Sequence, residues 1–243
     1  MDGPARAYYL TGTDTGVGKT VASVALLHAF ARNGLRATGM KPVASGCELT
    51  ADGWRNDDAL ALLAASEPAQ AYGLHNPFAL PEATAPQIAA ARAGVAVNLP
   101  AIVSAYAQLA GAADVMVVEG VGGWLAPLAD GLEQSTLASA LGLSVVMVVG
   151  LRLGCLSHAR LTERAIAADG LPIAGWIANG VDPEFAEVAE YKALLRTALS
   201  SPCLGWLPWT AETFSPALAA RLVLPVATTR LLAGSGTVSG SLY

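Results

Sequence analysis

The chain has 243 residues, of which 53% are hydrophobic and only 14% charged, and its formal net charge is −5. This acidic balance, without any cluster of lysine and arginine, argues against a nucleic-acid partner. No uncharged apolar run reaches the roughly 18 residues that would span a bilayer, and residues 1–6 lack the apolar core of a signal peptide, so we expect no membrane partner.

A Gly-rich loop follows the first apolar run of the chain. Residues 8–10 read Tyr-Tyr-Leu and predict a buried strand, and residues 12–20 read GTDTGVGKT. The loop ends like a phosphate-binding loop, G-x-x-x-x-G-K-[ST], although five residues rather than four separate Gly12 from Gly18. Residues 21–34 have apolar side chains at helical spacing and end in a glycine. Strand, Gly-rich loop and helix are the context that a phosphate-binding loop requires.

This loop offers the groups that a nucleotide phosphate needs. Glycines let successive backbone N–H groups point at phosphate oxygens, and the following helix adds its positive end. We expect Lys19 to reach the outer phosphates and Thr20 to place its hydroxyl on Mg²⁺. The alternative is that Gly-Lys-Thr merely opens an ordinary helix, but the flanking strand and helix favour nucleotide binding. Asp14 stands where partition-type ATPases carry a lysine, which argues against that group.

Four further apolar runs follow along the chain, each short and separated from the next by helical or loop sequence. They are residues 35–40, 114–119, 144–150 and 172–179. Continuous apolar strands that alternate with helices predict a mostly parallel sheet with helices on both faces. We therefore predict an α/β fold of the P-loop NTPase type, with a single domain over residues 1–224. The Gly- and Ser-rich residues 225–243 lose periodicity, and we expect this tail to be loosely ordered.

Polar residues stand at or just after the ends of these four runs, namely Lys41, Glu119, Arg152 and Asn179. In open parallel sheets, ligands bind beyond the carboxyl ends of the strands, so we expect these side chains to share one edge. A lysine is more often a surface residue, but the place of Lys41 after the second strand favours another role. It would neutralise charge on a transferring phosphoryl group.

Acidic residues at two places predict a magnesium site. Glu119 ends a buried run and precedes a glycine-rich stretch, where it is well placed to ligate Mg²⁺; a strand-end salt bridge is the alternative. Asp58 would supply a second oxygen and complete a site with Thr20 and the phosphates. The alternative for this acidic pair is that Asn56 or Asp57 simply caps a helix.

No histidine or cysteine is expected to act as a catalyst. His158 has no carboxylate or nucleophile spaced to partner it, which indicates a helix-surface or packed histidine, as for His28 and His75. The three cysteines are far apart and include no C-x-x-C pair, which favours reduced, non-ligand cysteines in a cytoplasmic protein; they are Cys47, Cys155 and Cys203. The turn at residues 151–157 leads into a helix whose free N–H groups would suit a carboxylate.

Together these stretches resemble the dethiobiotin synthetase family, and the match covers about residues 7–210. The motifs that carry it, in order, are GTDTGVGKT, KPVASG, NDDALAL, VVEGVGGW, VVGLRLGC, GWIAN and LPW. A single motif would be weak, but this ordered series is specific. The phosphate-binding loop of the family is itself the longer form, G-x-x-x-x-x-G-K-T, which accounts for the extra residue.

The resemblance implies an ATP-dependent cyclo-ligase that acts in the penultimate step of biotin synthesis. One amine of 7,8-diaminononanoate captures CO₂ as a carbamate, whose oxygen attacks the γ-phosphate to give a carbamic–phosphoric anhydride and ADP. The second amine closes the cyclic urea and expels phosphate. ATP and Mg²⁺ are the implied cofactors. A homodimer is implied as well, because the other subunit supplies contacts to the substrate carboxylate.

The resemblance also implies a role for each matched residue. Lys41 would bridge the carbamate and the transferred phosphoryl group, and Lys19 and Thr15 would contact phosphate. The Mg²⁺ ligands would be Thr20, Asp58 and Glu119. Further nucleotide contacts would come from Gly16, Val17, Gly18, Val21, Gly120, Val121 and Gly122, and the adenine would meet Asn179, Leu207, Pro208 and Trp209. The substrate would meet Ser45 at its diamine end and Leu151, Gly154, Cys155, Ser157 and Tyr191 at its carboxylate.

Two positions depart from the pattern of some members. Gly16 stands where these members have a glutamate, which alters the flexibility of the loop, and Ser157 stands where they have an asparagine, which affects one carboxylate contact.

Two other classes of protein are the alternatives. A cobyrinate-type amide ligase needs a second, glutamine-using domain, for which this chain lacks the length. A nucleotide-switch or partition protein is disfavoured by Asp14 and by the absence of a basic patch.

Overall fold

The computed structural model of the chain describes residues 6–225. The predicted tail, residues 225–243, therefore lies outside the described residues except for Pro225. Within the described part of the chain, none of the helices has the length and apolar character needed to cross a membrane.

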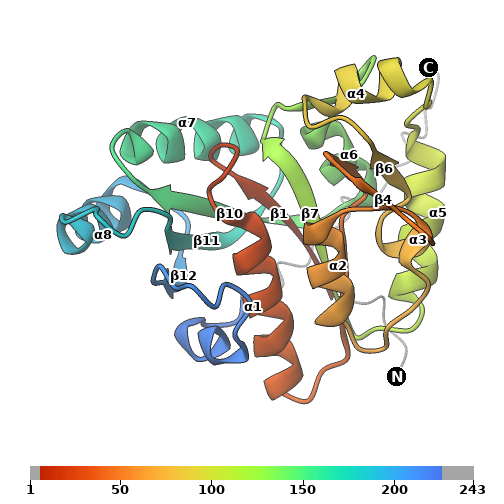
Figure 1. Cartoon of the computed structure of the whole chain (residues 1–243). Coiled ribbons are helices and arrows are strands. Elements are labelled where there is room, and N and C mark those ends of the chain that lie inside the picture. Colours follow the sequence, from red (N-terminus) through yellow and green to blue (C-terminus); the bar gives the residue numbers. More distant parts are fainter. Residues whose placement is uncertain (1–5, 226–243) are drawn as a thin grey trace, which may run out of the picture.

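A six-stranded parallel sheet forms the centre of the molecule, in the order β12-β11-β10-β1-β7-β2 (Figure 1). Its strands are β1 (Arg6–Gly12), β2 (Ala37–Met40), β7 (Val115–Gly123), β10 (Ser144–Leu151), β11 (Ile173–Gly180) and β12 (Cys203–Leu207). The five predicted apolar runs all form strands of this sheet, which confirms the α/β prediction. The sixth strand, β12, was not predicted from the sequence.

Helices cover both faces of this sheet. One face packs against α1 (Lys19–Arg32), α2 (Asp57–Ala64) and the 3₁₀ helix η1 (Pro216–Arg221). The other face packs against α5 (Leu99–Ala110), α6 (Gln134–Leu141), α7 (Cys155–Ala168) and α8 (Val188–Ala198).

Small elements fill the connections that follow β2 and β7. The connection after β2 contains α3 (Tyr72–His75), α4 (Pro86–Ala93), the parallel pair β3 (Val43–Ser45) and β6 (Phe78–Leu80), and the hairpin β4 (Glu48–Thr50) and β5 (Gly53–Arg55). The connection after β7 contains the antiparallel pair β8 (Pro127–Ala129) and β9 (Leu132–Glu133).

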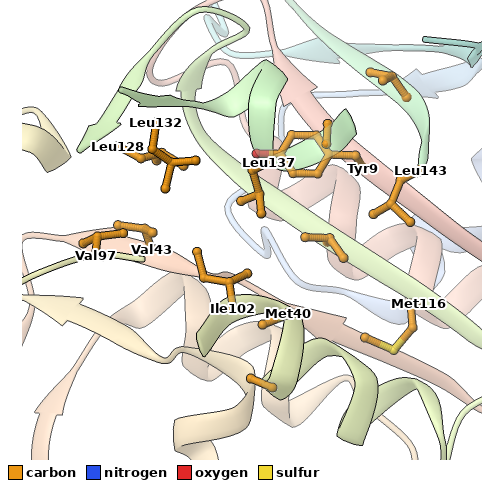
Figure 2. Packing of buried hydrophobic residues seen from close by; sticks show 14 of the residues in the cluster. Tyr9, Met40, Val43, Val97, Ile102, Met116, Leu128, Leu132, Leu137 and Leu143 are labelled. Atoms are coloured by element: carbon orange, nitrogen blue, oxygen red, sulfur yellow. The ribbon is translucent and has the colours of Figure 1, made fainter. Parts of the chain in front are cut away.

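The central strands are largely apolar because both of their faces are buried. In β1, Tyr8 points to one face and stacks on Phe30 of α1, with ring centroids 5.8 Å apart. Tyr9 points to the other face and meets Trp124 edge-on at 6.3 Å. Figure 2 shows Tyr9 beside Leu137 in this second core. Neighbouring residues of one strand therefore serve different cores, as expected for a sheet covered on both sides.

Several strands run further than the sequence predicted, and β7 and β11 show the reason. The run that ends at Glu119 continues as β7 to Gly123, and its register with β1 shifts between the pairs Leu10–Glu119 and Gly12–Gly123. The run predicted to end at Asn179 likewise continues in β11 to Gly180. The predicted strand ends were wrong here because backbone pairing with a neighbouring strand, which apolar patterning does not report, continues through polar residues and glycines.

Candidate active site

The phosphate-binding loop connects β1 to α1 at the carboxyl edge of the sheet. β1 ends at Gly12, and α1 begins at Lys19, directly after Gly18. Gly16 and Gly18 have positive φ angles of 71° and 78°. Glycine adopts this left-handed conformation without the steric cost that a Cβ atom brings. The loop therefore turns sharply into α1 and presents the positive N-terminal end of that helix at the sheet edge.

Lys19 spans the space between the loop and the end of β7. Its Nζ donates to the carbonyl oxygen of Asp14 at 3.1 Å and to that of Gly122 at 2.8 Å. Burial lowers the pKa of Lys19 to about 8; the carboxylate of Glu119 only partly offsets this desolvation, and the charge of Lys41 lowers the pKa further. That this ammonium contacts the outer phosphates of a nucleotide stays a prediction.

Glu119 is the centre of the polar cluster and is fully buried. Its Oε1 accepts hydrogen bonds from Thr20 Oγ1 and from Lys41 Nζ, both at 2.8 Å. Its Oε2 accepts one from Ser23 Oγ at 2.7 Å. A buried carboxylate is tolerated only where such donors replace water. Side chains from β7, from α1 and from Lys41, the residue after β2, therefore meet at this carboxylate.

Lys41 forms a second ion pair, with Asp58 in the first turn of α2. The lysine side chain is 5% exposed, whereas that of Asp58 is 44% exposed at the rim. Burial works to lower the pKa of Lys41, but the carboxylates of Glu119 and Asp58 outweigh it, so that the pKa is raised. Burial works to raise the pKa of Asp58, but attraction to Lys41 outweighs it and lowers that pKa. Both side chains are therefore held in their charged forms.

One cavity of about 400 Å³ joins these groups. Most of the predicted phosphate and metal residues line it, together with Ser45, Asn56 and two residues of a late loop. The lining consists of Thr15, Gly16, Gly18, Lys19, Thr20, Val21, Lys41, Ser45, Asn56, Asp58, Glu119, Val121, Gly122, Thr213 and Phe214. Of the four strand-end residues, Lys41 and Glu119 line this cavity, whereas Arg152 and Asn179 are not among its described lining residues.

The oxygen donors of this cavity fit a hard divalent cation. Asp58 and Glu119 offer carboxylates and Thr20 offers a hydroxyl, which is the ligand chemistry that Mg²⁺ prefers. Among residues 6–225 no group of three His, Cys, Asp or Glu could hold a metal ion. An ion here would need phosphate oxygens and water as well, which matches the usual habit of Mg²⁺ at nucleotide sites. In this structure the ammonium of Lys41 lies between the two carboxylates.

Curated relatives share most of the length of this chain. The chain is 58% identical over 219 residues to the ATP-dependent dethiobiotin synthetase BioD of Xanthomonas oryzae pv. oryzae (strain PXO99A), covering 90% of this chain and 98% of that protein. It is 58% identical over 217 residues to the protein of the same name from Xylella fastidiosa (strain 9a5c), covering 89% and 96%. The chain belongs to the dethiobiotin synthetase family. The family's use of ATP agrees with the Gly-rich loop described above.

Broader comparisons agree on the fold of this dethiobiotin synthetase family member. A family model described as an AAA domain matches residues 6–217. A ParA family ATPase from Chlorobium tepidum superposes with a TM-score of 0.54 at 12% identity, over 89% of this chain and 90% of that one. The MinC:MinD cell division complex of Aquifex aeolicus gives the same TM-score at 14% identity, over 87% and 86%. At such low identity these neighbours support the P-loop fold alone.

The residues that the family resemblance assigns to adenine lie behind the phosphate-binding loop. Asn179 is buried and its Nδ2 donates to the carbonyl oxygen of Val17 at 3.1 Å. Leu207 is fully buried at the end of β12, whereas Trp209, two residues later, is 53% exposed. Gly180 at the end of β11 lets the residues that follow β12 approach closely. A Cβ atom at this position would lie only 2.7 Å from the backbone nitrogen of Trp209.

None of the residues that the resemblance assigns to the substrate carboxylate is among the described residues that line this cavity. All of them except Tyr191 lie at the end of β10 and the start of α7, where Cys155 is buried and Ser157 is exposed. The backbone N–H of Cys155 donates to the Arg152 carbonyl oxygen and that of Ser157 to the Gly154 carbonyl oxygen, both at 3.1 Å. The sequence predicts free amides at this helix start. These two amides are instead engaged within the turn, so the prediction is wrong for them. Tyr191 on α8 packs edge-on against Phe185 at 4.9 Å.

Sequence reasoning missed several contacts of the site. Ser23 lies three residues after Thr20 on α1, and this spacing could have placed it beside the Glu119 carboxylate that Thr20 contacts. Arg152 was noted at a strand end, but its ion pair with Asp14, at 2.5 Å, was not foreseen. Their opposite charges after two neighbouring strands were the available signal. Phe214 gave no signal, because its loop reaches the cavity only through the tertiary fold.

The histidines occupy places that agree with their predicted structural roles. His158 is exposed on α7, and His75 is fully buried, with its Nδ1 2.6 Å from the carbonyl oxygen of Gly39. Neither histidine is among the described residues that line the cavity.

A larger hollow of about 620 Å³ lies between α4 and the β8–β9 pair, lined largely by alanine and valine. Its charged groups are already paired, Arg92 with Glu82 at 2.6 Å and Asp130 with the amide of Gln87 at 2.6 Å. This hollow therefore lacks the converging reactive groups of the phosphate-loop cavity.

Proposed function

We propose that this chain is a dethiobiotin synthetase that carboxylates 7,8-diaminononanoate with CO₂ and closes the ring at the expense of ATP. The observation that carries the proposal is the convergence of Lys41 with Lys19 and Thr20 of the phosphate-binding loop on one cavity. The names of relatives at 58% identity support the same activity.

The chemistry suits a site with cations and few acid–base groups. A carbamate is a poor electrophile, and phosphorylation turns one of its oxygens into a leaving group. This step needs alignment and neutralisation of charge more than proton transfer. Lys41, with its pKa raised, would bridge the carbamate and the transferred phosphoryl group, while Lys19 and Thr15 would hold the phosphates.

Thr20, Asp58 and Glu119 would hold Mg²⁺, which when bound neutralises charge on the phosphate oxygens. Ser45, which lines the same cavity, would contact the diamine end of the substrate. Asn179, Leu207, Pro208 and Trp209 would surround the adenine, and the exposed indole of Trp209 supports this assignment because it offers a flat surface to a base.

The functional unit in this proposal is a homodimer. The assigned carboxylate contacts, Leu151, Gly154, Cys155, Ser157 and Tyr191, lie outside the cavity of their own subunit. Contacts from a second subunit would complete the site. Leu153, beside them, is 83% exposed and would be covered in such a dimer.

Mixing two inactive variants tests this arrangement. Lys41→Ala and Ser157→Asp would damage opposite halves of a composite site, and a mixed dimer would keep one site free of both changes. Mixed subunits should therefore recover activity that neither variant has alone. No recovery in a mixture shown to contain mixed dimers would place all contacts within one subunit.

The remaining proposals concern organisation and location. We take residues 1–224 as one domain, which the match of one family model to residues 6–217 supports. We place the enzyme in the cytoplasm, and the free state of Cys47, Cys155 and Cys203 is in keeping with a reducing compartment.

Mass spectrometry of the product tests the proposed reaction most directly. The protein is incubated with 7,8-diaminononanoate, ¹³C-labelled bicarbonate, ATP and Mg²⁺. We expect a cyclic urea that carries the label, together with ADP and phosphate in equal amounts. If the rate of ATP hydrolysis depends on neither the diamine nor bicarbonate, the protein would instead be a nucleotide switch.

A further inference from the structure

The backbone of Lys41 is held on both sides by the end of α3. Its N–H donates to the carbonyl oxygen of His75 at 2.8 Å. Its carbonyl oxygen accepts a hydrogen bond from Asn76 Nδ2 at 2.7 Å. Asn76 is 3% exposed, so no solvent competes for this contact. Two consecutive residues thus fix the point from which the lysine side chain starts.

The hydroxyl of Tyr72 fixes the orientation of Asn76. It accepts a hydrogen bond from the backbone N–H of Asn56 at 2.9 Å and lies 3.0 Å from Asn76 Oδ1. A backbone N–H can only donate, so the tyrosine proton is left for Asn76 Oδ1. The amide of Asn76 must then turn its NH₂ group toward Lys41. The guanidinium of Arg55, 4.2 Å from the ring centroid, holds the tyrosine ring in place.

Asn56 carries the connection on to Asp58. Its side-chain Oδ1 accepts the backbone N–H of Ala59 at 3.2 Å and caps α2, the helix that bears Asp58. The carboxylate of Asp58 in turn contacts the ammonium of Lys41. The contacts therefore close a ring that runs from the backbone of Lys41 through Asn76, Tyr72 and Asn56 and returns at its side chain.

We propose that Tyr72 and Asn76 are positioning residues that set the place of the Lys41 ammonium relative to Asp58 and Glu119. Neither residue is among the described residues that line the cavity, so each acts through Lys41 and α2. A lysine side chain is long and flexible, and its ammonium stays in place only where its surroundings fix it. The kinetic part of this inference rests on the proposed function.

Tyr72→Phe is the central test, because it removes one hydroxyl and leaves the ring against Arg55. Hydrogen exchange measured by mass spectrometry should become faster in the peptides that contain residues 38–45 and 55–60. The kcat for ring closure should fall by about 10- to 100-fold, the scale at which misplacement of a reacting group is felt. The KM for ATP should stay within about twofold, since the phosphate-binding loop is untouched.

A matched control and a double variant separate positioning from general loosening. Tyr106→Phe removes the hydroxyl of a partly buried tyrosine on α5, a helix that packs beside α3 but takes no part in the ring of hydrogen bonds, and should leave both exchange at residues 38–45 and kcat unchanged. Asn76→Ala should lower kcat like Tyr72→Phe. The double variant should lose little more than either single variant, because both changes break the same ring.

The possible failures are distinguishable. If wild-type protein forms no labelled cyclic urea, the proposed function fails, and the exchange comparison alone decides whether the ring holds Lys41. If wild-type protein is active and Tyr72→Phe matches it in kcat, the positioning role is overturned, whatever the exchange shows. If the fold-losses in kcat of the two single variants multiply in the double variant, the positioning role is overturned as well.

Discussion

At the scale of single residues, Glu119 shows how this site can keep a charge away from water. No part of its side chain is exposed, yet two hydroxyls and one ammonium contact its carboxylate oxygens at 2.7–2.8 Å. Hydrogen bonds to a charged group contribute about 1.5–3 kcal/mol each, which offsets much of the cost of desolvation. The carboxylate is therefore a preorganised group whose partners come from the first turns of α1 and from Lys41, the residue after β2.

Lys41→Ala should abolish turnover while ATP still binds. The substitution removes the only ammonium that contacts both Asp58 and Glu119 among the described residues. Loss of a group that stabilises developing charge lowers kcat by about 10²–10³-fold or more. Steady-state kinetics together with calorimetric ATP binding measure both effects. Wild-type turnover in this variant would show that the assigned role of Lys41 is wrong.

Glu119→Gln should weaken Mg²⁺ binding, so that the reaction needs a higher Mg²⁺ concentration. The amide keeps the shape of the side chain but loses the charge that favours a divalent cation. Because changes to groups around a metal cost about 10–100-fold in affinity, the half-saturating Mg²⁺ concentration should rise by at least about tenfold. Asp57→Asn, an exposed neighbour of Asp58, is the control and should leave the titration unchanged. An unaltered titration for Glu119→Gln would contradict the ligand assignment.

At the scale of elements, the loop between β1 and α1 depends on a close approach to β11. Gly18 has a positive φ angle, and a Cβ atom built on it would lie 2.0 Å from Nδ2 of Asn179. The same Asn179 amide donates to the carbonyl oxygen of Val17. Strand β11 thus contacts the loop through Asn179, and this contact is possible only because Gly18 has no side chain.

Gly18→Ala should therefore disturb nucleotide binding more than Gly16→Ala does. Both positions have positive φ, so each alanine costs about 1–2 kcal/mol in backbone strain. Only at Gly18 does the added methyl group also collide with Asn179; at Gly16 no described atom lies within 4 Å. Urea unfolding and ATP titration of the two variants give the comparison. Equal losses in both would show that strain, rather than the collision, governs the loop.

The open space at Gly16 also bears on the departure from other family members. A larger side chain there would meet no described neighbour within 4 Å of its Cβ, so a glutamate in some members raises no steric conflict at that atom. The difference at this position therefore concerns backbone freedom rather than packing.

The core strands were predictable because a strand covered on both faces leaves an uninterrupted apolar run in the sequence. β1 and β10 show this directly. β12 escaped prediction because it lies at the edge of the sheet, where three of its five residues are only partly buried, and it forms no such fully buried run. The pairs β4–β5 and β8–β9 escaped for a different reason, because strands of two or three residues leave too short a pattern.

At the scale of the whole molecule, His75 makes the stability of the fold depend on pH. Its side chain is fully buried, and among the described residues its Nε2 has no hydrogen-bond partner. Burial lowers its pKa below the ordinary 6.5, although the contact with the Gly39 carbonyl works in the opposite direction. The folded protein therefore keeps this ring neutral at a pH where the unfolded chain protonates it.

The free energy of unfolding should then fall as pH drops below about 6.5 toward the lower folded pKa, by up to about 1.4 kcal/mol per pH unit for one proton. Above about pH 7 both states hold a neutral ring, and this contribution vanishes. His75→Asn, which removes the titration, should lose less stability than wild-type protein between pH 7.5 and 5.5 in urea unfolding. His158→Asn is the exposed control. Equal losses in wild type and His75→Asn would refute the role of His75.

The sequence by itself determined the class of fold and the ligand chemistry of the loop. Apolar runs, glycine spacing and Gly-Lys-Thr are local patterns, and local patterns dictate strands, turns and the helix start. The ordered series of motifs carried the family as well, which the relatives confirm.

Only the tertiary structure decided which polar groups meet. Ser23 and Thr20 reach Glu119 across 96 and 99 residues of chain, and Asp14 meets Arg152 across 138. The backbone clamp on Lys41 spans 35 residues through Asn76. Such contacts depend on strand order and register, because parallel strands bring distant segments to one edge, and no periodicity along the chain records which strands become neighbours.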